Sequence, residues 1–398
     1  MGIAIQLIIC AFVSLLTMRW IYSRVLKIAI VKGFMDNPNE RKLQKMPVPV
    51  LGGIAVVFGF VTGMLTFVAL QGISPSPVIH DITPILLGSI LMLYIGTMDD
   101  ILGLSSSLRL VIEVVVMLGV IYGSGICIDS FHGLWGIQSF SWRVAVPLTV
   151  FAGVGLINAY NMVDGVNGLS SGLYIASSCL LIGISWKCED YVGCAIALCF
   201  ACSMLPFFMH NVFGRKSRMF IGDGGSMVMG LLVTWSVMRV LSCNNAYEMI
   251  GRNFQGCRLG LVALMLSVAS VPVFDTVRVM FSRILRGESP CKADKTHLHH
   301  KLVGIGLSHP ATAMCEILLN LLVVGIWYLS YRLGLSVNVQ FNIVMVSSIL
   351  LIWGTYFTLS KISERIPEIR ERKWVKNTHV ERKKWWLTLE QWLDRGVD

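Results

Sequence analysis

The sequence predicts an all-α, polytopic membrane protein with about 11 transmembrane helices. Apolar residues make up 55% of its 398 residues, charged residues only 14%, and the mean hydropathy is +0.69. A helix needs on the order of 20 apolar residues to cross a hydrocarbon core, and runs of that size recur along the chain. No long hydrophilic block separates these runs. The spans are therefore expected to form one membrane domain, although the length alone would allow two or three soluble domains.

The predicted spans are bounded by polar turns. They cover residues 4–24, 50–70, 83–98, 109–123, 144–160, 169–186, 191–209, 224–241, 258–279, 312–331 and 340–360. The first span has no basic segment before it and positive charge after it, which is typical of an uncleaved anchor with its N-terminus outside. Of the 33 Lys and Arg, 27 then fall on the cytoplasmic segments and six on the other side. This satisfies the positive-inside rule and places the C-terminus in the cytoplasm.

The charged residues also define two regions of the chain. The net charge of +10 lies in loops between spans, where topology explains it, so no nucleic-acid partner is expected. Residues 1–360 form the predicted membrane domain, and residues 361–398 form a basic, Trp-rich cytoplasmic tail. In this tail, Trp385, Leu389, Trp392 and Leu393 share one helix face, which predicts a helix lying on the anionic inner leaflet. The alternative is a mobile charged tail.

Most of the 11 cysteines lie in apolar runs, where they act as small hydrophobes. Cys243 and Cys257 share one predicted outer loop and could form a disulfide. Their distance cannot be obtained from the sequence, so the pairing stays open.

One polar stretch, residues 158–169, interrupts the apolar pattern most strongly. Asn161, Asp164 and Asn167 are spaced three residues apart and can share a face of a helical turn, while Gly165 and Gly168 permit close approach of a ligand. An ionisable group at the bilayer centre costs roughly 2.5–3.5 kcal/mol, so such residues usually have a function. A polar turn that only joins two helices is the alternative.

Four further polar segments fall on the same predicted face, which is the cytoplasmic one. They are residues 36–53, Asp99–Asp100, residues 215–225 and residues 275–300. The loops on the other side are short and chemically plain. A transporter usually places its ionisable residues near the middle of the membrane. An enzyme that joins a soluble donor to a lipid acceptor needs them at the interface, and this pattern therefore favours an enzyme.

Two of these segments carry carboxylates. Asp99 and Asp100 close an apolar span, and neighbouring acids repel unless a cation or a shared proton relieves them; an aspartate-rich turn or cap is the alternative. Gly222 and Asp223 open the eighth span, where backbone amides favour phosphate but the carboxylate would repel it. A divalent cation resolves this conflict, because Mg²⁺ is usually held by one or two carboxylates together with substrate phosphates.

Other polar residues suggest anion contacts. Asn211 and Arg215 precede the Gly222 turn, and the basic residues there form either a solvated loop or a clamp for an acidic donor. His297, His299 and His300 fit contacts to a diphosphate better than a zinc site, which needs different spacing and a fourth ligand. Neutral surface histidines are a further alternative.

Arg109 and Glu113 lie four residues apart and can form an ion pair. Such a pair lowers the cost of the carboxylate in that helix, and it is interpreted as structural.

Taken together, these motifs resemble the polyprenyl-phosphate N-acetylhexosamine-1-phosphate transferases, glycosyltransferase family 4, from about residue 30 to residue 310. The resemblance rests on residues 36–42 with 47–53, Asp99–Asp100, residues 158–169, residues 222–226 and residues 297–300. Five motifs in this order are highly specific. The basic loop at residues 213–218 is most similar to that of bacterial UDP-GlcNAc:undecaprenyl-phosphate GlcNAc-1-phosphate transferases, which start O-antigen and other cell-surface polysaccharides. The muramoyl-pentapeptide branch matches less well.

The resemblance implies transfer of a sugar 1-phosphate from a UDP-sugar to undecaprenyl phosphate, with release of UMP, at the cytoplasmic face of the bacterial inner membrane. It implies that Asp223 binds Mg²⁺ or Mn²⁺ with Asn161, and that Asp99 and Asp100 position or deprotonate the lipid phosphate. The implied substrate-binding residues are Asp164, Asn167, Asn211, Lys42, Arg215, Gly222, His297, His299 and His300. A homodimer is compatible with the sequence.

Two positions depart from the pattern of many bacterial members. Asn167 stands where they have a second aspartate, and Gln44 where they have a histidine. Eukaryotic relatives also carry asparagine at the first position, so the change is not interpreted as inactivating. Alternatives are another UDP-N-acetylhexosamine or the muramoyl-pentapeptide donor and, in a different class, a lipid-carrier binding protein or transporter.

Overall fold

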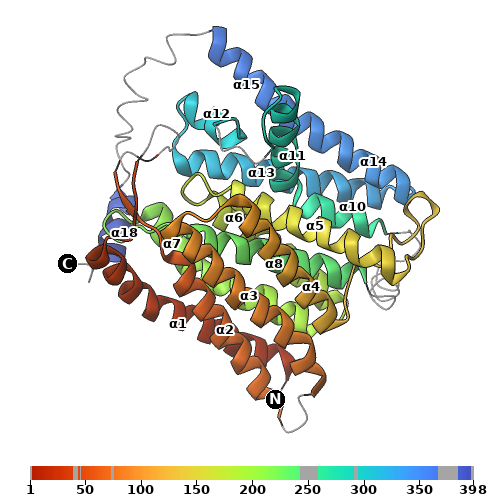
Figure 1. Ribbon diagram of the computed structural model, residues 1–398, viewed down its shortest axis with the longest axis horizontal. Helices are drawn as coiled ribbons and strands as arrows, with labels where there is room; N and C mark the ends of the chain where they lie inside the picture. The colour runs from red at the N-terminus through yellow and green to blue at the C-terminus, as the bar shows by residue number, and fades with distance from the viewer. Residues whose placement is uncertain are drawn as a thin grey trace.

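The computed structural model describes residues 2–38, 44, 46–72, 76–242, 259–290, 295–365 and 384–395. Within these residues, ten helices are long and apolar enough to cross a membrane, and an eleventh candidate is a pair of helices joined at a sharp bend. This confirms the predicted all-α, polytopic membrane fold (Figure 1). The predicted orientation of the termini stays a prediction.

The long helices follow the predicted spans closely. They are α1 (Ile3–Lys32), α2 (Gly52–Leu70), α3 (Ser76–Leu102), α4 (Ser106–Ser124), α5 (Trp142–Met162), α6 (Leu169–Lys187), α7 (Tyr191–Phe213), α8 (Gly222–Leu241) and α13 (His309–Arg332). The last span runs from Val337 to Ser363. It consists of α14 (Val337–Ser348), a π-helical segment (Ile349–Trp353) and the first part of α15 (Gly354–Arg365).

Short elements lie between and beyond these spans. They are β1 (Met35–Asp36), β2 (Val48–Pro49), a 3₁₀ turn (Leu134–Gly136), α10 (Leu261–Val268), α11 (Ser270–Leu285), α12 (Leu298–Gly304) and α18 (Lys384–Asp394). The two strands pair antiparallel, with Met35 opposite Pro49. This small hairpin connects the end of α1 to the start of α2.

Helix α8 is the buried centre of the domain. In its most apolar 18-residue window, 94% of the residues are buried, a larger share than in any other described span. Glycines let its neighbours approach closely: a Cβ at Gly96 of α3 would lie 2.3 Å from the backbone nitrogen of Gly224, and one at Gly53 of α2 would lie 2.6 Å from that of Gly225. Small residues at such contacts are typical of membrane helix pairs. The N-terminus of α8 is thereby fixed between α2 and α3.

The predicted ninth span, residues 258–279, corresponds to two helices joined at a sharp bend. The chain bends by 77° between α10 and α11, and α11 continues to Leu285. Asn320 of α13 satisfies the backbone at this break: its Oδ1 accepts hydrogen bonds from the Ser270 hydroxyl and the Val271 N–H, both at 3.0 Å, and its Nδ2 donates to the Val268 carbonyl. Non-helical backbone inside a membrane requires such partners.

The end of the domain opposite the α8 N-terminus is not chemically plain, contrary to expectation. Arg239 donates to both carboxylate oxygens of Asp190 at 2.8 Å and to Asp81 at 2.7 Å. These residues line a cavity of about 620 Å³ with Asp129 and Glu189. The sequence did not reveal this assembly because its members come from α3, from α8 and from two separate connections.

The tail helix α18 packs against the end of α7. The rings of Phe213 and Trp386 lie 4.6 Å apart, and Leu393 is buried while Trp385 and Trp392 are exposed. Cys243, Cys257 and Lys42 lie outside the described residues.

Candidate active site

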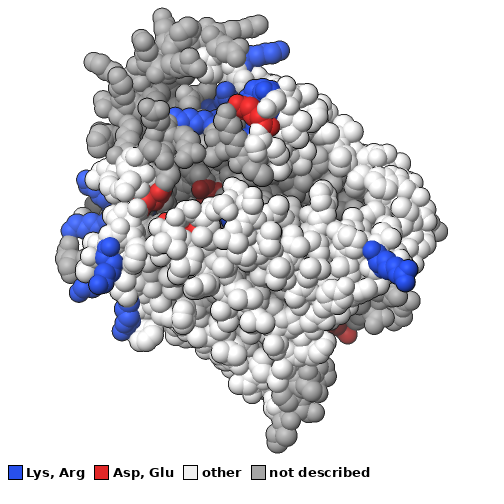
Figure 2. All heavy atoms as spheres, in the orientation of Figure 1, with Lys and Arg blue, Asp and Glu red and all other residues white. Residues whose placement is uncertain are grey.

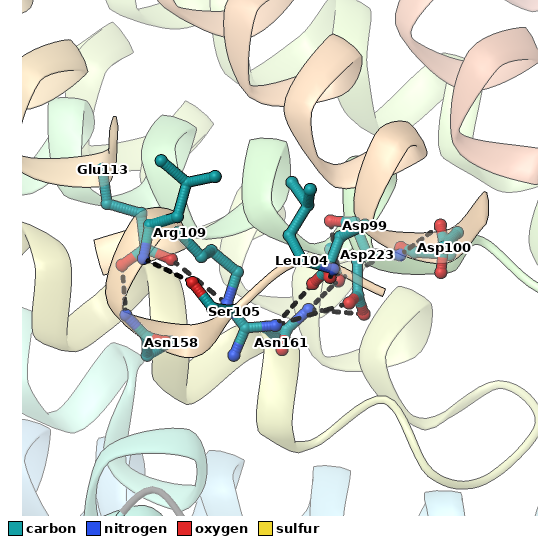
Figure 3. Close-up of polar contacts among 12 residues, drawn as sticks. Asp99, Asp100, Leu104, Ser105, Arg109, Glu113, Asn158, Asn161 and Asp223 are labelled. Carbon is teal, nitrogen blue, oxygen red and sulfur yellow. Dashed lines mark hydrogen bonds and ion pairs between the residues drawn. The ribbon is translucent and has the colours of Figure 1, made fainter. Parts of the chain in front are cut away.

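The Asp99–Asp100 pair ends α3 beside the N-terminus of α8 (Figure 3). Oδ2 of Asp100 accepts a hydrogen bond of 2.9 Å from the backbone N–H of Asp223. The first N–H groups of a helix have no partner within the helix and favour a negative charge. Gly222 makes this approach possible, because it has φ +74° and a Cβ there would lie 2.4 Å from Asp100 Oδ2. One carboxylate of the pair therefore fixes the turn that presents Asp223.

Asp99 makes different contacts from Asp100, because adjacent residues on a helix point in different directions. Its Oδ1 accepts from the Leu104 N–H at 2.7 Å, and its Oδ2 accepts from Arg109 at 2.8 Å. Asp223 lies beside the same guanidinium, with its Oδ2 3.5 Å from Arg109 Nη1. A shared cation reduces the repulsion between two neighbouring carboxylates.

Arg109 occupies the centre of this cluster (Figure 3). Its Nη1 is 2.8 Å from Asp99 and 3.5 Å from Asp223, and its Nε is 3.8 Å from Glu113. The predicted pairing of Arg109 with Glu113 is confirmed, but its interpretation as purely structural is too narrow. One guanidinium partly neutralises three carboxylates from three helices.

Two asparagines of the residue 158–169 stretch complete the cluster. Asn158 donates to Glu113, which is almost completely buried. Asn161 uses its Nδ2 to donate to Asp223 Oδ1 and to the Ser226 hydroxyl, both at 2.9 Å. The amide oxygen of Asn161 is then the atom that can approach a cation next to Asp223. The predicted grouping of Asn161 with Asp223 is therefore present in the structure.

Asp164 lies in the turn that follows α5. It accepts a hydrogen bond of 2.6 Å from the Ser170 hydroxyl. Its pKa is raised to about 6, mainly by burial and also by the nearby negative charges of Asp223 and Asp36, against the lowering effect of the Ser170 hydrogen bond. Such a raised pKa is typical of a functional site.

The turn also contacts the histidine motif and the loop before α8. A Cβ at Gly165 would lie 2.3 Å from Nε2 of His299, so the imidazole packs directly on the backbone. Asn211 is buried; it accepts from the Gly168 N–H at 2.7 Å and donates to the Met219 carbonyl at 2.9 Å. Both functional groups of Asn211 thus join two loops of the protein. Its predicted contact with a nucleotide stays a prediction.

The histidine motif begins α12 and is held by α11. His297 Nδ1 lies 2.8 Å from Asp275, which also pairs with Arg278 at 2.7 Å. His299 is 1% exposed, and its Nδ1 has no hydrogen-bond partner among the described residues. Burial lowers the pKa of His299 well below its ordinary value. The His299 ring is therefore neutral near pH 7 and can accept or donate a single hydrogen bond.

The sequence was compared with known protein families and with individual proteins. Residues 82–241 match the family model described as Glycosyl transferase family 4. Over 307 residues, the chain is 30% identical to the probable undecaprenyl-phosphate N-acetylglucosaminyl 1-phosphate transferase of Bacillus subtilis (strain 168), and the match covers 77% of this chain and 79% of that relative. The chain belongs to glycosyl transferase family 4.

Two further relatives of this family 4 chain carry similar names. The undecaprenyl-phosphate alpha-N-acetylglucosaminyl 1-phosphate transferase of Escherichia coli (strain K12) is 30% identical over 292 residues, which is 71% of this chain and 72% of the relative. The enzyme of the same name from Yersinia pestis is 27% identical over 293 residues, 71% and 73% of the two chains. The resemblance seen in the motifs is thus confirmed.

The described residues of the family 4 motifs lie close together in the structure. One contact network, joined through Arg109, contains Asp99, Asp100, Asn161, Gly222 and Asp223. The turn at residues 164–168 connects this network to the histidines. Asn167 adjoins this connection, since its backbone nitrogen lies 3.4 Å from His309 Nδ1. Arg215 is exposed on the loop before α8. The roles assigned to these residues stay predictions.

Sequence reasoning did not show that Arg109 and Glu113 join the carboxylate cluster or that Asp275 holds His297. One signal was available for Arg109: it is the first Lys or Arg after the Asp99–Asp100 pair and the only one before Arg143. An isolated cation that begins the helix following two carboxylates is well placed to pair with them.

Proposed function

We propose that this chain transfers N-acetylglucosamine 1-phosphate from UDP-GlcNAc to undecaprenyl phosphate and releases UMP. The reaction would occur at the cytoplasmic face of the bacterial inner membrane and would start synthesis of a cell-surface polysaccharide, such as the O-antigen of lipopolysaccharide. The observation that carries the proposal is the single carboxylate network built by Asp99, Asp100 and Asp223 at the ends of membrane helices. The names of the relatives support the donor and the acceptor.

The donor set fits a divalent cation. The Asp99 and Asp223 carboxylates both contact the guanidinium of Arg109, at 2.8 Å and 3.5 Å. Among the described residues, no three His, Cys, Asp or Glu form a complete metal cage. This is compatible with Mg²⁺, which typically takes one or two carboxylates and completes its shell with substrate phosphates and water. Asp223 and the Asn161 amide oxygen would hold the ion, with Mn²⁺ as a substitute.

When bound, Mg²⁺ would neutralise charge that develops on the donor diphosphate. The residues of the chain have separate tasks. Asp99 would accept the proton that the lipid phosphate carries, while Arg109 fixes the orientation of that carboxylate at 2.8 Å. Asp100 would keep Asp223 in place through the α8 N-terminus. Positioning and electrostatics of this kind account for most of the catalysis of phosphoryl transfer.

The bond changes balance without a further reactant. An oxygen of the lipid phosphate attacks the phosphorus that bears the sugar, and a new P–O bond forms. The bond from that phosphorus to the oxygen bridging to the second phosphate breaks, and its electron pair leaves with UMP. The products are a lipid-linked sugar diphosphate and UMP.

The surface of α11 supports a lipid acceptor. Val277, Phe281, Ile284 and Leu285 are all at least 48% exposed, and their spacing places them on one side of the helix. Asp275 and Arg278, on the buried side of the same helix, hold His297. An apolar face next to a polar site suits a polyprenyl chain whose phosphate enters that site.

The donor would bind on the soluble side of the cluster. Figure 2 shows Asp and Glu side chains in a hollow of this face, with Lys and Arg gathered along the neighbouring edges. Asp164, Asn167 and the histidines border the Gly165 turn there. We assign nucleotide contacts to Asp164 and Asn167 and phosphate contacts to His299 and His300.

The test is a donor panel. Purified full-length protein in detergent would be given undecaprenyl phosphate, Mg²⁺ and one of several UDP-sugars, and UMP release would be measured. UDP-GlcNAc is expected to give the highest rate, and release should need the lipid. Highest activity with UDP-MurNAc-pentapeptide or another UDP-N-acetylhexosamine would overturn the sugar assignment. Donor binding without UMP release from folded protein would support the binding-protein alternative.

A further inference from the structure

A second polar cavity lies away from the carboxylate cluster, where the tail helix α18 meets α1 and the end of α7. Its volume is about 150 Å³, which is about five times the share of one water molecule in the liquid. Its polar lining consists mainly of Arg19, Ser23, His210, Ser217, Trp392 and Arg395. The cavity has room for a phosphate group with bound water.

Two arginines line this cavity, and neither has a counter-ion among the residues that the structure describes. Arg19 stacks over the ring of Trp392 at 4.6 Å. Neither Arg19 nor Arg395 forms a hydrogen bond or an ion pair with another described residue. Arg19 comes from α1 and Arg395 directly follows α18. An anion between them would contact guanidinium groups from both ends of the sequence, and Arg is well suited to bind phosphate.

The carboxylate closest in sequence to Arg395, that of Asp394, forms hydrogen bonds with residues 215–217. Asp394 accepts hydrogen bonds from the backbone N–H groups of Arg215, Lys216 and Ser217 at 2.9–3.2 Å, and from the Ser217 hydroxyl at 2.7 Å. Burial alone would raise the pKa of Asp394, but these hydrogen bonds outweigh it and lower the pKa. Asp394 therefore binds the backbone of this loop and forms no ion pair with Arg19 or Arg395.

The surroundings of the cavity match the surface of a membrane. Trp20, Trp385 and Trp392 are 45–61% exposed, and exposed tryptophans concentrate where a protein crosses the headgroup region. Leu16 and Phe12 lie three and seven residues before Arg19, on the same side of α1, and both are exposed. An apolar track thus leads from the arginines along a membrane-spanning helix.

We propose that this cavity binds the phosphate of an anionic phospholipid, with Arg19 and Arg395 around the headgroup and the acyl chains along Leu16 and Phe12. The lipid would fasten α18 to α1. Because Asp394 holds residues 215–217, and Asn211 joins this loop to Gly168, lipid binding would also stabilise the loop that leads into α8. The site is independent of the proposed reaction and needs no substrate.

The test uses the full-length protein in detergent with an equimolar mixture of phosphatidylglycerol and phosphatidylcholine of identical acyl chains. Native mass spectrometry would count the lipids that stay bound. Wild type is expected to prefer phosphatidylglycerol by about 30-fold, the preference that two arginines near an anionic headgroup provide. Arg19→Gln with Arg395→Gln should remove most of this preference. Arg24→Gln is the matched control, because Arg24 lies on the same helix but stacks on Trp20 outside the cavity.

Three results would overturn the proposal. One is equal retention of both lipids by wild type, and another is an unchanged preference in the double variant. The third is release of phosphatidylglycerol by millimolar inorganic phosphate, which would indicate a soluble anion as the ligand. The single variant Arg395→Gln, outside the membrane spans, provides the same comparison if the double variant does not fold. UMP release measured on the same samples is a separate readout, so loss of activity alone does not count against lipid binding.

Discussion

Gly96 offers the sharpest test of how helix packing places the catalytic carboxylates. An added Cβ would lie 2.3 Å from the Gly224 nitrogen and 2.4 Å from its Cα, whereas ordinary contacts begin at 3.4 Å. In Gly96→Ala, the obstructing atoms are backbone, so α3 and α8 must separate by about 1 Å at this point. No rotation of a side chain can relieve the contact.

The displacement acts directly on the site. Asp99 and Asp100 follow Gly96 within about one helical turn, and Asp223 immediately precedes Gly224. A separation of about 1 Å would stretch the 2.9 Å hydrogen bond from the Asp223 N–H to Asp100 beyond bonding distance. Misplacement of catalytic groups by about 1 Å can lower a rate by roughly 100-fold. Overpacking should also cost about 1–3 kcal/mol of stability.

The assay compares initial rates of UMP release and thermal unfolding midpoints for wild type, Gly96→Ala and Gly119→Ala. Gly119 lies in α4, and nothing lies within 4 Å of its added Cβ. The control is therefore expected to keep wild-type activity and to gain slightly in stability, since Ala favours a helix over Gly by about 1 kcal/mol. If folded Gly96→Ala kept a rate within about threefold of wild type, the placement of the carboxylates by this contact would be refuted.

Three other substitutions test separate features. The pKa of Asp164 is raised from 3.8 to about 6, so the free energy of unfolding should fall by up to about 3 kcal/mol as the pH rises between these values. Asp164→Asn should remove this fall in unfolding curves recorded at a series of pH values. The same pH dependence in the variant and the wild type would contradict the prediction. Arg109→Met removes the cation shared by three carboxylates. The rate of UMP release should fall by about tenfold or more, and the Mg²⁺ concentration that gives half of the maximal rate should also fall. Arg143→Met is the control, and an unchanged Mg²⁺ dependence in Arg109→Met would exclude a role of Arg109 in offsetting the charge of the cluster. Asn320→Leu leaves the groups at the α10–α11 break without partners and should lower stability by about 2–4 kcal/mol in thermal unfolding; an unchanged midpoint would show that the bend does not need this residue.

The fold was largely predictable because membrane spans have a strong signal. The need to satisfy every backbone group in lipid restricts the chain to helices, and length and hydropathy locate them. The bend at Ala269 could not be predicted in the same way. It depends on Asn320, about 50 residues later in the sequence, and residues 258–279 are apolar enough to read as one helix.

The site was predictable in its composition but not in its contacts. The polar segments at one face indicated which residues meet, since intramembrane polarity is costly. The sequence did not show that the Asp100 carboxylate accepts a hydrogen bond from the N-terminus of α8. It also did not show that the side-chain oxygen and nitrogen of Asn211 both bind backbone groups of neighbouring loops. Those assignments depend on side-chain directions fixed by the packing of α3, α7 and α8. Arg109 illustrates the same limit, because its spacing to Glu113 was visible while its contact with Asp223, 114 residues away, was not.

The most direct measurement is UMP release from UDP-GlcNAc and undecaprenyl phosphate during a Mg²⁺ titration, with wild type compared with Asp223→Asn. We expect release that requires both the lipid and the metal, one lipid-linked sugar diphosphate formed for each UMP, and a rate about 100-fold or more lower in the variant. Manganese binding to both proteins without substrates would give a second readout, and weaker binding is expected in the variant. Undiminished turnover in the presence of chelator, or by Asp223→Asn, would contradict a metal-assisted transfer at this carboxylate cluster.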